Sequence, residues 1–148
     1  YREKGPVPEE EYIIPLGVAD IKREGKHVTL VTYSRQVLNA LQAAEQLAQE
    51  GIDVEVIDLR TLKPLDIDTV VASVKKTGRL VAVTEAYENT SFINEVMAQV
   101  NDLAFDWLDA PMVRVAAANV PVPRAETLED LAIPNVKRII EACRKVVS

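Results

Sequence analysis

Two carboxylates three residues apart, Glu85 and Glu88, are the side chains of this sequence best suited to acid–base chemistry. They directly follow the apolar run Leu80–Thr84, which is typical of a buried strand. Open α/β sheets bind ligands beyond the carboxyl ends of their strands, so a proton could be held and moved here. Exposed acidic pairs are also common in loops, and the residue types alone favour a solvated pair.

Two hydroxyl residues, Thr90 and Ser91, close the same polar stretch, just before a helix that we expect to begin near Phe92. The free N–H groups of a helix N-terminus can hold an anion, although a hydroxyl in this place more often caps the helix. We therefore interpret Glu85, Glu88, Thr90 and Ser91 as a candidate ligand-binding loop at the edge of the sheet.

The other candidates for nucleophilic or metal chemistry are isolated from one another. Ser34 would need a base, but the single histidine, His27, opens the strand that Ser34 closes, about 20 Å away. We expect Ser34 to cap the following helix, His27 to lie in a surface turn, and Cys143 to pack as a small hydrophobe. One cysteine and one histidine do not make a zinc site. We predict no catalytic, cofactor-binding or metal-binding residue in this chain.

A strand–helix–strand unit holds these positions. Residues Val28–Val31 form a β-rich run, apolar residues recur at helical spacing from Val37 to Leu47, and Val54–Ile57 form a second apolar run. Gly51 stands where a left-handed C-terminal cap is expected. Strands joined by such a crossover lie parallel, and the turn at 32–35 lacks the glycines of a dinucleotide or P-loop site.

The chain continues this alternation to its end. Asp66 is placed to cap a second helix that Gly78 ends, and a third strand covers Leu80–Thr84. Further predicted elements are a helix from Phe92, a strand at Met112–Ala116, a last helix from about Pro134 and Asn135, and a short strand at Val18–Lys22 pairing antiparallel with the first core strand. We predict a three-layer α/β fold, with a mostly parallel sheet of about five strands and helices on both faces.

Length and charge limit the classes of function. The 148 residues suit one domain, which we place at residues 12–148 after an arm or linker at residues 1–11. A net charge of −6 argues against nucleic acid as a partner. No apolar run approaches a membrane span, and the single cysteine agrees with a reducing compartment.

Several motifs in a fixed order identify a resemblance. The most specific is residues 56–66, VIDLRTLKPLD. The others are IPLG at 14–17, VTLV at 28–31, ALQAA at 40–44, EGI at 50–52, LDAP at 108–111 and VPVP at 120–123, with Ala125 and Leu128-Glu129 after it. Together they resemble the C-terminal domain of the β subunit of 2-oxo acid dehydrogenase E1 components, which has the transketolase C-terminal fold. The resemblance covers nearly the whole chain from Tyr12.

The resemblance implies part of a thiamine diphosphate-dependent enzyme of the pyruvate, branched-chain 2-oxo acid or acetoin type. In that family the α subunit holds the diphosphate and Mg²⁺, and a glutamate in the N-terminal domain of the β subunit activates the cofactor. No cofactor or metal ion is therefore expected to bind in this domain. The implied partners are an E1 α subunit or fused α region, a second β subunit, and the basic peripheral subunit-binding domain of E2. The implied location is the bacterial or archaeal cytoplasm or the mitochondrial matrix.

Partner contacts are expected at Asp106 and Asp109, with Arg124 and Glu126 near the C-terminal segment. Two alternatives remain open: the equivalent domain of a transketolase or 1-deoxyxylulose-5-phosphate synthase, and a stand-alone interaction or small-ligand domain. The sequence also departs from the family. Residues 85–95 lack the glycines that members commonly carry after the third strand, and Asn119 and Arg124 replace a more usual Asp and Tyr.

Overall fold

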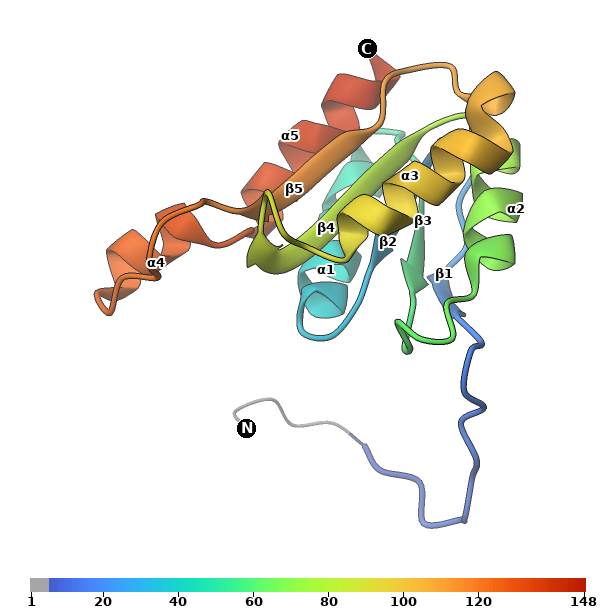
Figure 1. Ribbon diagram of the computed structural model, residues 1–148, viewed down its shortest axis with the longest axis horizontal. Helices are drawn as coiled ribbons and strands as arrows, with labels where there is room; N and C mark the ends of the chain where they lie inside the picture. Colours follow the sequence, from blue (N-terminus) through green and yellow to red (C-terminus); the bar gives the residue numbers. More distant parts are fainter. Residues whose placement is uncertain (1–5) are drawn as a thin grey trace.

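The structure is a computed structural model that describes residues 6–148, apart from the side chains of Glu126, Thr127 and Asp130. Five strands, five α-helices and one short 3-10 helix alternate along this part of the chain (Figure 1). In order they are β1 (Asp20–Arg23), β2 (Val28–Thr32), α1 (Gln36–Gln49), β3 (Val54–Asp58), α2 (Ile67–Thr77), β4 (Leu80–Tyr87), α3 (Ile93–Ala104), η1 (Phe105–Trp107), β5 (Val113–Ala117), α4 (Glu126–Ala132) and α5 (Val136–Val147).

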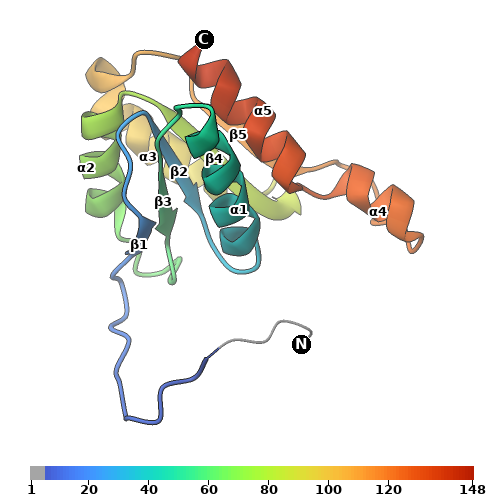
Figure 2. The ribbon, with the colours of Figure 1, turned by 180° about the vertical axis from the view of Figure 1, so that it is seen from behind.

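The strands form one sheet in the order β1-β3-β2-β4-β5, in which every pair except β1–β3 is parallel. Helices α1 and α5 cover one face, and α2 and α3 cover the other (Figure 2). The central strand β2 is buried along its whole length, because it has a strand on both sides and helices on both faces. The predicted α/β class and its mostly parallel five-stranded sheet are confirmed.

The first strand departs from the prediction in both place and partner. It lies at Asp20–Arg23 and pairs antiparallel with β3, not with the first core strand β2. Strand β2 has no free edge, because β3 and β4 already flank it. Two hydrogen bonds draw the incoming backbone to the outer edge of β3: Gly17 N–H donates to Thr61 Oγ1 at 3.0 Å, and Ala19 N–H donates to Asp66 Oδ2 at 2.9 Å.

Helix α2 begins and ends as predicted. Asp66 Oδ1 accepts the N–H of Thr69 at 3.1 Å, and Gly78 ends the helix with a left-handed φ of 69°. Lys75 and Lys76 occupy the last turn, where cations favour the helix dipole. Asp66 therefore has two roles, because the same carboxylate caps α2 and holds Ala19.

Ser34 does not cap α1, contrary to the prediction. It has a left-handed φ of 59°, Arg35 takes the N-cap position, and no side chain caps the helix. The Ser34 carbonyl, rather than the hydroxyl, accepts the N–H of Val37 at 3.2 Å. The turn from β2 into α1 is too tight for the extended backbone that a capping side chain needs.

The segment after β5 contains a short helix, α4, that the sequence analysis did not predict. Residues 119–131 leave the sheet and return to it, because Ala118 N–H donates to the carbonyl of Ala132 at 2.9 Å. We call residues 119–131 the excursion. Helix α4 forms its second half and projects away from the sheet (Figure 1).

Candidate functional site

A cavity of about 310 Å³ lies at the carboxyl edge of the sheet, between the N-termini of α1 and α5. The sheet changes direction here, because the chain runs from β2 outward to β3 and later returns to β4 on the other side of β2. Such switch points are the usual ligand sites of open α/β sheets. The lining residues are Arg35, Gln36, Asn39, Glu85, Glu129, Ile133, Pro134, Asn135, Val136 and Lys137.

Gln36 organises the polar groups of this cavity. Its side chain is buried, and its Nε2 donates to Glu85 Oε1 at 3.1 Å and to the carbonyl of Pro134 at 3.2 Å. Its Oε1 accepts from Asn39 Nδ2 at 3.0 Å. Glu85 thus lies at the edge of the sheet as predicted, but as a hydrogen-bond acceptor beside an amide. Arg35 and Lys137 bring positive charge to the same rim, and the mixed lining suits a small polar ligand more than acid–base catalysis.

The other members of the predicted ligand-binding loop lie outside this cavity. Strand β4 continues through Tyr87, three residues beyond the predicted end, so the polar turn begins only at Glu88. Glu88 Oε1 accepts from Arg114 at 3.0 Å, and Arg114 also donates to Asn94 Oδ1 at 2.6 Å. The two glutamates therefore have separate partners, which excludes shared acid–base work by this pair.

Thr90 and Ser91 do not cap α3 through their side chains. The helix has no side-chain cap, and the Ser91 carbonyl accepts the N–H of Asn94 at 3.1 Å. Thr90 instead lines a groove of about 380 Å³, together with Tyr87, Asn89, Asn119, Val120 and Pro121. The groove separates the β4–α3 turn from the start of the excursion.

Asp106 and Asp109 lie at the opposite edge of the sheet, beside exposed apolar side chains. Phe105 is 65% exposed, and Leu103 and Trp107 are 53% exposed each. Asp109 Oδ2 lies 3.9 Å from Arg79, and Lys75 lies over the Trp107 ring at 5.7 Å. We call the set Leu103, Phe105, Asp106, Trp107 and Asp109 the η1 surface. The sequence analysis named the two acids of this surface but missed its two aromatic residues. A signal was present, because Phe105 and Trp107 flank Asp106 in residues 104–109, AFDWLD, and a buried turn rarely has this composition.

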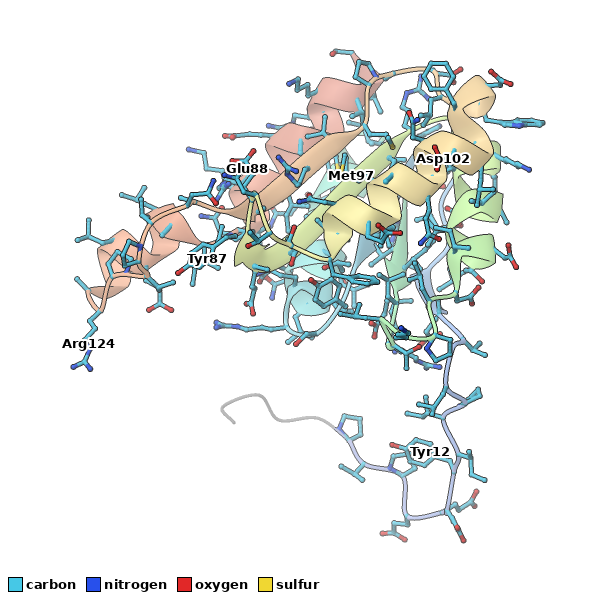
Figure 3. The ribbon with its side chains drawn as sticks, in the orientation of Figure 1. Tyr12, Tyr87, Glu88, Met97, Asp102 and Arg124 are labelled. Atoms are coloured by element: carbon cyan, nitrogen blue, oxygen red, sulfur yellow. The ribbon has the colours of Figure 1, made fainter. Side chains whose placement is uncertain are left out.

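Arg124 lies far from the η1 surface, at the tip of the excursion (Figure 3). Glu126, expected to contact the same partner, is outside the described side chains. The four predicted partner-binding residues therefore belong to two separate regions of the molecule.

Isolated reactive residues have structural roles. His27 lies in a turn, as predicted, and its Nδ1 accepts the N–H of Asp53 at 2.9 Å. Cys143 is buried among the apolar residues of α1 and α5, which confirms its assignment to the core. No group of three or more His, Cys, Asp or Glu side chains in the described part of the chain could hold a metal ion. No helix in that part is long and apolar enough to cross a membrane.

Cys143 is expected to resist thiol reagents in the folded chain. Burial raises the pKa of its thiol to about 12, so at neutral pH almost none of it is the reactive thiolate. Iodoacetamide at pH 8 should label the chain only after urea unfolds it, as followed by mass spectrometry. Rapid labelling of the native chain would contradict the packing of α5 against α1.

The family of the chain follows from its sequence match. Residues 17–139 match the family described as transketolase, C-terminal domain. The chain belongs to this family. It is 49% identical over 147 residues to the β subunit of acetoin:2,6-dichlorophenolindophenol oxidoreductase from Cupriavidus necator, covering 99% of this chain and 44% of that protein.

Two further comparisons support the assignment of this chain to the transketolase C-terminal domain family. The chain is 47% identical over 149 residues to the mitochondrial pyruvate dehydrogenase E1 component subunit beta-1 of Arabidopsis thaliana, covering 98% of this chain and 41% of that subunit. A solved structure of a split-gene transketolase, an inactive beta4 tetramer, superimposes with a TM-score of 0.79 at 27% identity, covering 90% of this chain and 43% of that one. The chain spans less than half the length of these relatives.

Proposed function

We propose that this chain is the C-terminal assembly domain of an E1 β subunit of a 2-oxo acid dehydrogenase. Relatives that are β subunits of pyruvate dehydrogenase E1 and of the acetoin enzyme share 47% and 49% of its residues, which favours this branch over a transketolase at 27%. The η1 surface is the single observation that carries the docking role, because a domain that is complete in itself has no need to expose two aromatics beside two acids. The domain joins its subunit to partners and supplies no reacting group.

The charge of the η1 surface defines the partner that it fits. Its two acids, the neighbouring Asp102 and the net charge of −6 favour a basic partner, and Phe105 and Trp107 offer apolar area for an anchor. The peripheral subunit-binding domain of the E2 acyltransferase is such a partner. Complementary charge would speed the encounter, and burial of the aromatics would hold the complex.

The chemistry of the whole enzyme takes place outside this domain. Thiamine diphosphate with Mg²⁺ supplies the carbanion chemistry for decarboxylation, and the acyl group passes to a lipoyl group on E2. An E1 α subunit or fused α region would hold the cofactor, in the bacterial or archaeal cytoplasm or the mitochondrial matrix. The chain by itself is expected to be inactive, because it spans less than half the length of the β subunits that it resembles, and the resemblance places the cofactor outside this domain.

Calorimetric titration with an E2 peripheral subunit-binding domain tests this docking role. The unchanged chain should bind, and its affinity should fall as salt is raised. Replacing both acids, Asp106→Lys with Asp109→Lys, should weaken binding at least about tenfold, the loss of one good interfacial contact.

The matched control reverses two exposed acids on the other face, Glu45→Lys with Glu141→Lys, which changes the net charge by the same amount. The control should keep most of the affinity, since its charges lie away from the η1 surface. Equal weakening by both variants would mean that net charge alone drives binding. No binding by the well-folded, unchanged chain would remove the docking role.

A further inference from the structure

The cavity between the N-termini of α1 and α5 is lined by charged side chains of both signs. We call it the switch-point cavity. Arg35 and Lys137 supply two cations to it, and two carboxylates come from Glu85 and Glu129. None of these four forms an ion pair with a described side chain. Opposite charges that line one cavity without neutralising each other are available to a ligand that carries both.

The two kinds of charge come from different elements. Arg35 is the N-cap residue of α1, and Lys137 lies in the first turn of α5. Helix α1 has no side-chain cap, so its first N–H groups add to the positive potential on this side. Glu85 lies near the end of β4, and Glu129 belongs to α4. The negative group of a ligand is therefore favoured beside the two helix N-termini, and its positive group beside the two glutamates.

Gln36 holds one of the two carboxylates at the cavity. Its buried side chain donates from Nε2 to Glu85 Oε1 at 3.1 Å and to the carbonyl of Pro134 at 3.2 Å. Glu85 Oε2 has no hydrogen-bond partner in the described part of the chain, so it can accept from a bound ammonium group. The acceptor is positioned before any ligand arrives, which reduces the entropy that binding would cost.

The cavity also has an apolar wall and a small volume. Ile133, Pro134 and Val136 line it where the chain enters α5, and all three are buried or half-buried. The volume of about 310 Å³ is near the lower end of the range for ligand pockets, about 300 to 1,000 Å³. The ligand is therefore a small molecule with an aliphatic part.

We propose that the switch-point cavity binds an aliphatic α-amino acid. The carboxylate of the amino acid lies toward Arg35 and Lys137, and its ammonium group lies toward Glu85 and Glu129. Its side chain packs against the apolar wall. A phosphate or a 2-oxo acid would leave the two glutamates without a counter-charge, and a metal ion would face two cations. The site lies at the opposite edge of the sheet from the η1 surface, so it adds a binding activity to the assembly role.

Amide NMR of the isotope-labelled chain, titrated with L-leucine, tests this site. Leucine should shift the amide signals of the first turns of α1 and α5, with saturation below about 10 mM. The 2-oxo acid of the same carbon skeleton lacks the ammonium group, and isoamylamine lacks the carboxylate. Each should bind at least about tenfold more weakly than leucine, because each leaves one pair of charges unmatched. Glycine keeps both charges but lacks the aliphatic part, and it should also bind more weakly.

Two variants with matched controls assign the charges. Lys137→Met should raise the dissociation constant of leucine at least about fivefold, whereas Lys145→Met, at the exposed other end of the same helix, should leave it unchanged. Glu85→Gln keeps an acceptor for Gln36 but removes the charge, so it should reduce the preference for leucine over the 2-oxo acid. Glu45→Gln, an exposed acid of α1, should keep that preference. The amide spectra also show whether each variant is folded.

Three results would overturn the proposal. The first is a folded, unchanged chain whose signals do not move with leucine up to about 10 mM. The second is equal binding of leucine and the 2-oxo acid, which would indicate a site for anions alone. The third is a set of shifted signals that lies away from the first turns of α1 and α5. Binding to E2 through the η1 surface is measured separately and would be unaffected by any of them.

Discussion

The replacement Gly25→Ala is expected to reduce the free energy of unfolding by about 3 kcal/mol, one of the largest effects of any conservative change in this chain. Gly25 lies in the turn between β1 and β2, pressed against β3. A Cβ at this position would overlap the backbone of Val54 and Glu55, so the turn would have to move away from the sheet. That movement would also stretch the 3.2 Å hydrogen bond from Gly25 N–H to Glu55 Oε2.

Gly51→Ala is the matched control for this change. Gly51 has a left-handed φ of 80°, but a Cβ there would meet no atom within 4 Å. Its cost is only backbone strain, about 1 kcal/mol. Urea unfolding followed by the fluorescence of Trp107 measures the free energy of unfolding of both variants. In a thermal scan the Gly25 variant should melt about 10 °C lower than the unchanged chain. Equal losses in the two variants would show that the turn adapts without strain.

The sheet and most of its helices could be predicted because their signals are local. Largely apolar runs at Val28–Val31, Val54–Ile57 and Leu80–Thr84 became the three inner strands, since strands buried on both faces are mostly apolar along their length. Asp66 and Gly78 marked the ends of α2 through chemistry that acts within a few residues. Conclusions of this kind need no knowledge of the tertiary structure.

The errors concern choices that depend on distant residues. The side of the sheet taken by β1 is decided by Thr61 and Asp66, more than forty positions along the chain. Helix α4 was missed because it is short and its two leucines, Leu128 and Leu131, are exposed, so they mark no buried stripe. Ser34 has a residue type suited to capping, but its backbone conformation rules it out.

The candidate sites also include features that the sequence could predict and features that depend on distant residues. Glu85 was placed correctly at the edge of the sheet, since strand direction follows from the sequence pattern. The contact between Glu85 and Gln36, which lies on helix α1 nearly fifty residues earlier in the chain, has no sequence signal. The acids Asp106 and Asp109 were predicted to contact a partner only because of the resemblance to the family. The exposed aromatics beside them became visible only when the structure showed that α3 ends before Phe105 and leaves that ring in solvent.

The replacement Lys76→Met is expected to destabilise the chain by about 2 kcal/mol at pH 7. Glu55 points from β3 into the space beneath α2, its side chain is 1% exposed, and Lys76 is its only cationic partner among the described side chains. Methionine keeps the apolar stem but leaves a buried carboxylate uncompensated, which costs 3 to 5 kcal/mol when the pair is fully enclosed. The estimate is lower here because the Lys76 side chain is 43% exposed, so water can reach the gap.

The destabilisation should shrink as the pH falls. In the unchanged chain burial raises the pKa of Glu55, but hydrogen bonds from Lys76, Ser73 and the Gly25 N–H outweigh it and hold the pKa below its usual value of 4.5. The stability that this carboxylate contributes is therefore present above about pH 4.5 and is lost as the pH falls through its lower folded value. Without Lys76 the burial dominates, and the pKa of Glu55 should rise above the usual value. The variant then takes up a proton on folding, which narrows its deficit below about pH 5.

Two comparisons isolate the Glu55–Lys76 pair. Lys75→Met removes the neighbouring cation of the same helical turn and should cost only about 0.5 kcal/mol, since that cation lies over an exposed Trp107 ring. In a chain that already carries Glu55→Gln, Lys76→Met should have almost no effect, because the neutral amide needs no counter-charge. Urea unfolding of the four variants between pH 3 and pH 7 gives the coupling between the two side chains. A deficit that stayed constant over this range would mean that Lys76 stabilises the helix through its apolar stem and not through Glu55.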